Sequence, residues 1–85
     1  MLNRNDLDVL PIQHAVANAS PSAWLDGLAL SAPIGEVHVL LLDGRVLELT
    51  TFAEIQAGEP VAFHPVAEIL AVGATRTRAR KSPGY

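Results

Sequence analysis

The 85-residue chain contains no cysteine, which excludes disulfide bonds and the structural zinc sites that depend on cysteine thiolates. Aromatic residues make up only 5% of it and are not arranged as a platform for stacked nucleic-acid bases. No apolar run is long enough to cross a bilayer; Val39–Leu42 is typical of their length. The N-terminal sequence MLNRNDLDVLPIQ has Asp6 and Asp8 where a secretion signal would be apolar, so no export signal is expected.

A chain of this length supports one small domain, which buries only about 60% of the surface that its unfolded form exposes. Such domains usually gain stability from disulfides, metals or oligomerisation. Because disulfides and cysteine zinc sites are excluded, the sequence favours oligomerisation as the additional source of stability.

Charge is divided unevenly along the chain, whose net charge is −3. Residues 1–75 contain all nine acidic residues and only two basic ones, which gives this part a charge of −7. The last ten residues, RTRARKSPGY, contain no acid and four basic residues: Arg76, Arg78, Arg80 and Lys81. We interpret them either as a solvated basic tail or as one that binds an acidic surface or a neighbouring subunit.

The chain is predicted to have three parts. Residues 1–22, with Pro11 and Pro21, are expected to form an extended N-terminal arm, with a short helical turn around Gln13–Asn18. Residues 23–75 form the β domain and residues 76–85 the basic tail. Short β-prone runs separated by turn residues, with no long helical pattern, predict an all-β fold: a small sandwich or barrel of about five to seven strands.

Two features are predicted to interrupt the strands. The pairs Asp26-Gly27 and Asp43-Gly44 are predicted to be turns. The run VAFHPVAEILAVGAT reads as two strands broken at His64-Pro65, because proline cannot donate a ladder hydrogen bond. Beyond it, the alternation of three arginines with Thr77 and Ala79 would place their guanidinium groups on one side of an extended chain.

The central segment GEVHVLLLDGRVLELT is predicted to be a β-hairpin with a two-residue type I′ turn at Asp43-Gly44. In that register one face carries His38, Leu40, Leu42, Arg45, Leu47 and Leu49, and is assigned to the core. The opposite face carries Val37, Val39, Leu41, Val46, Glu48 and Thr50. This second face is too apolar to remain in water, so Val37, Val39, Leu41 and Val46 are predicted to form a subunit interface.

Candidates for chemistry are few. His14, His38 and His64 have none of the short spacings that build a metal or catalytic site locally, and no serine lies in a nucleophile-elbow context. The sequence therefore predicts no catalytic residue, no cofactor and no metal ion. Trp24, the one tryptophan, is expected either to pack in the core or to anchor a subunit contact.

The order of these pieces resembles that of spike-base-type small virion proteins of tailed phages, prophages and gene transfer agents. The resemblance runs from residue 28 to residue 77 and depends on the order of its motifs. They are Leu28–Leu30, Gly35, Val37 and Val39, Asp43-Gly44, Thr50-Thr51, Ala57-Gly58, His64-Pro65-Val66, and Ile69–Thr75 with Gly73. The chain departs from the family in its basic end and in Glu68.

The resemblance implies a structural, non-enzymatic virion protein that is the base of a head spike or fibre. It would form a homo-oligomeric ring, most simply a pentamer, at the fivefold vertex of a phage-like particle or gene transfer agent. Its expected partners are the major capsid protein and a spike fibre protein, with no membrane and no specific nucleic acid. Its location would be the virion, assembled in the cytoplasm.

The composition supports a second interpretation from another class. A free small β-barrel binding module could use the basic residues Arg76, Arg78, Arg80 and Lys81 to recruit nucleic acid or an acidic protein.

Overall fold

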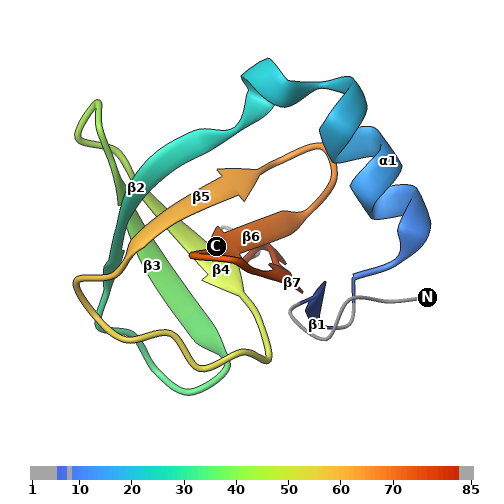
Figure 1. Ribbon diagram of the computed structural model, residues 1–85. Helices are drawn as coiled ribbons and strands as arrows, with labels where there is room; N and C mark the ends of the chain where they lie inside the picture. The colour runs from blue at the N-terminus through green and yellow to red at the C-terminus, as the bar shows by residue number, and fades with distance from the viewer. Residues whose placement is uncertain (1–5, 8, 83–85) are drawn as a thin grey trace.

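A computed structural model describes residues 6–7 and 9–82 (Figure 1). Its elements in chain order are β1 (Asp6–Leu7), α1 (Pro11–Ala19), a 3-10 turn (Pro21–Ala23), β2 (Leu25–Leu30), β3 (Glu36–Leu41), β4 (Val46–Thr50), β5 (Pro60–His64), β6 (Ile69–Val72), β7 (Thr75–Arg78) and β8 (Arg80–Lys81). The all-β prediction is confirmed. No helix in this part of the chain has the length and hydropathy needed to span a bilayer.

The strands form one sheet in the order β1-β7-β6-β5-β2-β3-β4-β8, antiparallel except where β1 runs parallel to β7. Only Ala79 separates β7 from β8. The same stretch of chain therefore pairs with β6 on one side and with β4 on the other, and it closes the sheet into a small barrel. The Ser82 amide adds to the closure by donating to the Glu48 carbonyl oxygen at 2.8 Å.

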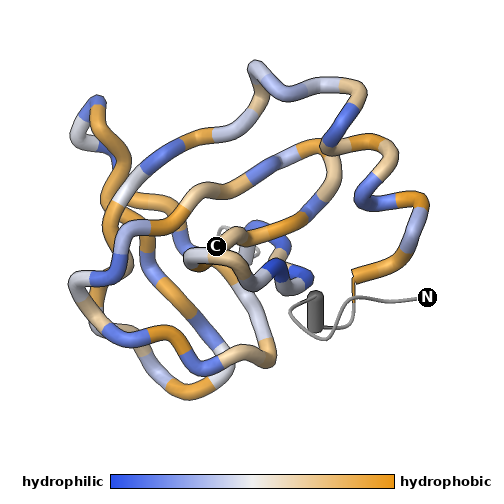
Figure 2. The backbone as a smooth tube through the Cα atoms, viewed as in Figure 1, coloured by the Kyte–Doolittle hydropathy of each residue, from blue (hydrophilic) through white to orange (hydrophobic). Residues whose placement is uncertain are grey.

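The core fills the inside of this barrel. Hydrophobic and hydrophilic residues alternate along the strands, as Figure 2 shows, because successive side chains of a strand point to opposite faces. The inward-facing set is buried and includes Ala29, Val37, Val39, Leu41, Leu49, Val61, Phe63, Leu70 and Ala79. The apolar residues inside are aliphatic apart from Phe63, which suits a narrow interior.

A second, smaller core lies between α1 and the outer face of the sheet. Val9, Ala17, Ala67 and Ile69 are buried there, with Val16 and Trp24 packed beside them. Residues 11–19 form a helix that covers part of the barrel (Figure 1), so the helical turn expected around Gln13–Asn18 is confirmed and is longer than predicted. The extended arm predicted around it is wrong over this stretch.

Two local features favour the helix. Pro11 occupies its first turn, where a missing amide hydrogen has no cost, and the Gln13 Oε1 atom accepts a hydrogen bond from the Leu10 amide at 2.9 Å. The Gln13 Nε2 atom then donates to the Ala67 carbonyl at 3.0 Å, which ties the helix to the turn between β5 and β6.

The central hairpin has a different register from the predicted one. Leu40 lies opposite Val46 and Val39 opposite Leu47. The Leu41 amide donates to the Arg45 carbonyl at 2.8 Å, and the Gly44 amide donates to the Leu41 carbonyl at 3.0 Å. The loop therefore has three residues, a turn followed by a bulge at Gly44, which has a φ of 91°.

This one-residue difference changes which side chains of the two strands share a face. Val37 and Val39 now lie opposite Leu49 and Leu47, and the face that carries them is the inner one. Val37, Val39 and Leu41 are exposed by 2%, 0% and 5%, so they belong to the barrel core. The prediction that they form a subunit interface is wrong. Within the hairpin loop only Gly44 has a positive φ, so the loop is not a type I′ turn and is one residue longer than such a turn.

The prediction that Asp26-Gly27 is a turn is wrong, because the pair lies in the middle of β2. A Cβ atom on Gly27 would lie 2.4 Å from the Leu40 carbonyl oxygen and 2.8 Å from Val39 Cγ1. Glycine is present here because β2 and β3 approach closely.

The segment predicted to be a basic tail is part of the sheet over most of its described length. Residues 75–78 and 80–81 are strands of the barrel wall, and Thr77 and Ala79 point inward and are buried. The alternation seen in the sequence is thus the in-and-out pattern of a sheet strand. The final residues of the prediction, 83–85, lie outside the described part.

Candidate assembly surface

Exposed apolar side chains cross the outside of β2, β3 and β4. Leu28 is paired with Leu40, and Leu40 is paired with Val46, so the three lie side by side on neighbouring strands. Their exposed fractions are 45%, 37% and 51%. Pro60 of β5 pairs with Leu28 and extends the line by one exposed residue. We call Leu28, Leu40 and Val46 the apolar row.

The apolar row faces outward because its strand neighbours face inward. Val39 and Leu41 flank Leu40 along β3 and are both buried in the barrel. Helix α1 covers the outer face near β6, through Ile69 and Ala67, and does not reach the row. One part of the outer face of the sheet is therefore covered within the chain, and the part that carries the apolar row is left exposed.

A polar group borders the apolar row. His38 lies directly opposite Glu48, and Glu36 precedes His38 by two residues on the same face of β3. The His38 Nε2 atom is 3.6 Å from Glu36 Oε1 and 3.9 Å from Glu48 Oε1. Among the described residues, this is the group of histidine and carboxylate ligand atoms close enough together to share one metal ion.

Two further apolar residues project from loops at one end of the barrel. Ile34 and Phe52 are almost fully exposed. The Thr51 amide donates to the Gly35 carbonyl at 3.1 Å, which brings the loops that carry these two side chains together. This end of the barrel therefore also presents apolar surface.

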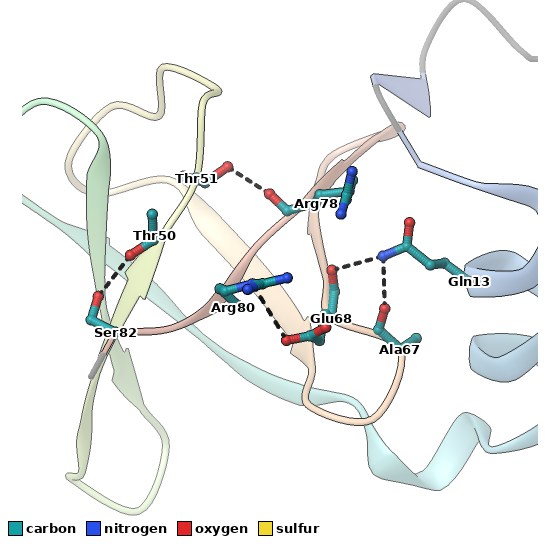
Figure 3. A network of polar contacts seen from close by, with 8 residues as sticks. All are labelled: Gln13, Thr50, Thr51, Ala67, Glu68, Arg78, Arg80 and Ser82. Carbon is teal, nitrogen blue, oxygen red and sulfur yellow. Dashed lines mark hydrogen bonds and ion pairs between the residues drawn. The ribbon is translucent and has the colours of Figure 1, made fainter. Parts of the chain in front are cut away.

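A cleft of ≈ 280 Å³ lies along the seam where β4 meets β7 and β8 (Figure 3). The Thr51 hydroxyl donates to the Arg78 carbonyl at 2.8 Å, and the Thr50 and Ser82 hydroxyl oxygens are 3.0 Å apart. Arg80 Nε lies 3.8 Å from Glu68 Oε2. These contacts hold the seam together, and the cleft contains no arrangement of nucleophile and base.

Glu68 occupies a special backbone position at this cleft. It is the described non-glycine residue with a positive φ, 58°. Its carbonyl accepts from the Ala79 amide at 3.0 Å and from Gln13 Nε2 at 3.4 Å. The strained turn thus joins α1, the β5–β6 connection and the stretch from β7 to β8, residues 75–81, which we call the closing strand.

Trp24 makes its contacts within the chain. Its ring meets the His64 ring edge-on, with centroids 5.1 Å apart, and the Arg76 guanidinium lies 5.3 Å from the Trp24 ring centroid. Since Trp24 also packs against the smaller core, its position fits the packing interpretation rather than the subunit anchor.

His64 is fully buried and has both ring nitrogens satisfied. The Ala67 amide donates to His64 Nδ1 at 3.0 Å, so Nδ1 is an acceptor and Nε2 carries the hydrogen that is donated to the Ser20 carbonyl at 2.9 Å. His64 is therefore a structural residue that links the 3-10 turn to the β5–β6 connection.

The four basic residues have different surroundings. Arg76 is half-buried and its Nη1 atom is 3.0 Å from His14 Nδ1. Arg78, Arg80 and Lys81 are exposed, the two arginines on the outer face and Lys81 opposite Leu49 at the end of the strand. Three of the residues predicted to bind a partner are thus on the surface, although on a strand and not on a tail.

Of the residues predicted for the interface, Val46 is the one that lies in the exposed apolar row. Leu28 and Leu40 were not predicted. Leu40 was assigned to the core because the predicted register placed it on the inner face.

Comparisons with known proteins do not identify the chain: no family model, no curated protein sequence and no solved structure matches it.

Proposed function

We propose that this protein is a non-enzymatic structural subunit that assembles with copies of itself through the apolar row into a ring, and that this ring is the base of a head spike or fibre on a phage-like particle. The observation that carries the proposal is the contiguous apolar row Leu28, Leu40 and Val46 on the outside of three adjacent strands. Water contact with such a surface is unfavourable, and a second copy would remove it.

A second copy fits this surface for two reasons. The row lies on regular, hydrogen-bonded strands, so it is a rigid surface that needs no reordering on association. The border of the row is acidic, through Glu36 and Glu48, and the exposed Lys81 gives a head-to-tail neighbour a positive charge to place against it.

The virion setting of the proposal is supported by the order of sequence motifs between residues 28 and 77. In this setting the ring would be a pentamer at a fivefold vertex, in contact with the major capsid protein and with a fibre protein. The end of the barrel that carries Ile34 and Phe52 offers an apolar surface for one of these partners.

The first experiment is native mass spectrometry of the purified chain over a range of salt concentrations. We expect a discrete oligomer that persists at high salt, because apolar contacts are not screened by ions. A monomer at all salt and protein concentrations would contradict self-assembly.

Substitution then tests the surface itself. Val46→Lys introduces a charge into the apolar row and should give a folded monomer. Val66→Lys is the matched control, since Val66 is exposed by 66% in the turn after β5, away from the row, and should leave the oligomer intact. An oligomer that survives Val46→Lys, or that is lost equally with Val66→Lys, would show that the row is not the interface.

The binding-module alternative is less favoured by the contacts of the basic residues. Arg76 is held by His14 and Trp24, and Arg80 lies near the Glu68 carboxylate, so these two guanidinium groups already make contacts within the chain. Deletion of residues 76–85 would not separate the alternatives, because it would remove the strand that closes the barrel.

A further inference from the structure

The polar group beside the apolar row has the composition of a metal site. Glu36, His38 and Glu48 each offer one ligand atom, and these three atoms lie within 4.8 Å of one another. One nitrogen and two oxygen donors form a set that binds first-row transition metals such as zinc.

The distances are close to those of a coordinated ion. Zinc binds nitrogen and oxygen ligands at about 2.0–2.2 Å, so neighbouring ligands in a tetrahedral site are about 3.3–3.6 Å apart. The His38 Nε2 atom lies 3.6 Å from Glu36 Oε1 and 3.9 Å from Glu48 Oε1. Both separations approach this range without any change in the backbone.

The state of His38 is a second, independent indication. Its Nε2 atom is shielded from solvent and makes no hydrogen bond to any described residue. An unsatisfied polar atom of this kind has a free-energy cost, and a bound ion would remove that cost. The same atom is the one that lies near both carboxylates, so an ion held by them would be within its reach.

The strand geometry prepares the site. His38 and Glu36 project from β3, which has strands on both sides, and Glu48 projects from β4 directly opposite His38. The Glu48 side chain is exposed by 65% and can rotate to improve the coordination. Two ligands are therefore fixed by a central strand, and the third is free to adjust.

We propose that Glu36, His38 and Glu48 bind a divalent transition-metal ion of the zinc type, through His38 Nε2 and one oxygen of each glutamate, with a remaining position open on the outer face. The nitrogen donor favours this class over calcium and magnesium, which take oxygen ligands. The site belongs to a single chain, so it does not depend on the assembly proposed above.

The test is calorimetric titration of the untagged full chain with zinc chloride, in a buffer that does not bind metals. We expect one zinc ion per chain. Replacement with cobalt(II) should give visible absorption of the intensity typical of four-coordinate cobalt, and the His38 ring signals in an NMR spectrum should shift on zinc addition.

His38→Ala and Glu48→Gln should each weaken zinc binding at least about 10-fold, because each removes a direct ligand or its charge. Glu54→Gln is the matched control, since Glu54 is an exposed glutamate outside the group and its change should leave the affinity unaltered. Circular dichroism confirms that the variants are folded.

The proposal is overturned if zinc does not bind up to millimolar concentration. It is also overturned if His38→Ala and Glu48→Gln, shown to be folded, bind as tightly as the parent chain, or if Glu54→Gln weakens binding as much as they do. The assembly proposal would survive each of these results, because its test measures the oligomer of Val46→Lys.

Discussion

At the scale of single residues, Asp43 illustrates how local contacts set electrostatics in an exposed turn. Its Oδ1 atom accepts a hydrogen bond from the Arg45 amide at 3.0 Å, and its Oδ2 atom is 2.7 Å from Arg45 Nε. The backbone hydrogen bond, followed by the side-chain one, lowers the pKa of Asp43 below its ordinary value. The charged form is thus favoured by the turn.

Titration of the carboxyl carbons by NMR should therefore place the pKa of Asp43 below that of an unstructured aspartate. Arg45→Ala should raise it only partly, because the backbone amide that makes the larger contribution remains. Since the folded-state pKa is lowered, the contribution of Asp43 to stability is present above its unfolded pKa and is lost as the pH falls through the lowered value. A full return to the ordinary value in Arg45→Ala would contradict this order of causes.

Single residues also explain which features of the site were predictable. Gly44 was correctly placed in the hairpin loop, but Asp-Gly is compatible with loops of two and of three residues. The choice of the shorter loop shifted the pairing by one. It put His38 opposite Leu49 and Glu48 opposite Val39, on different faces, and so concealed both the apolar row and the polar group beside it.

At the scale of elements, the closing strand is the part on which the barrel depends. Thr51 is buried, and its hydroxyl joins the end of β4 to β7 by donating to the Arg78 carbonyl at 2.8 Å while it accepts from the Ala53 amide at 3.3 Å. Thr51→Val keeps the shape but removes both hydrogen bonds and leaves the part-buried Arg78 carbonyl without this donor. We expect a loss of about 1–3 kcal/mol in the free energy of unfolding.

Urea unfolding measures this loss. Thr50→Val is the matched control, because Thr50 lies at the same seam but is exposed and its hydroxyl pairs with that of Ser82. Its effect should stay within about 0.5 kcal/mol. Equal effects of the two substitutions would mean that the Thr51 hydrogen bonds do not stabilise the seam.

Elements differed in how far the sequence could predict them. The strands around His64-Pro65 were predicted correctly, because proline and glycine interrupt the pattern at their ends. Helix α1 was missed beyond a short turn, because its apolar residues are meaningful only against Ile69 and Ala67, far along the chain. The closing strand was predicted to be a tail because the alternation of arginines with Thr77 and Ala79 fits an exposed extended chain as well as a barrel strand, and only the burial of Thr77 and Ala79 distinguishes the two.

At the scale of the whole molecule, the all-β class could be predicted and the closure could not. Closure depends on one stretch of chain pairing with two strands that are distant in the sequence, β4 and β6. No local pattern records such pairing. The sequence predicted a second apolar face on the hairpin but assigned it to Val37, Val39 and Leu41, which are buried in the barrel. Which part of the outer face is covered by α1 and which part is exposed requires the three-dimensional arrangement.

The order of the strands along the chain also determines when the protein can fold during its synthesis. The stretch from β7 to β8 is made after β4 and β6, the two strands that it joins, and β1 also has its partner in β7. The barrel therefore cannot close before the chain up to residue 82 has left the ribosome. Protease protection of stalled chains lengthened by a flexible linker should begin only when residue 82 has emerged.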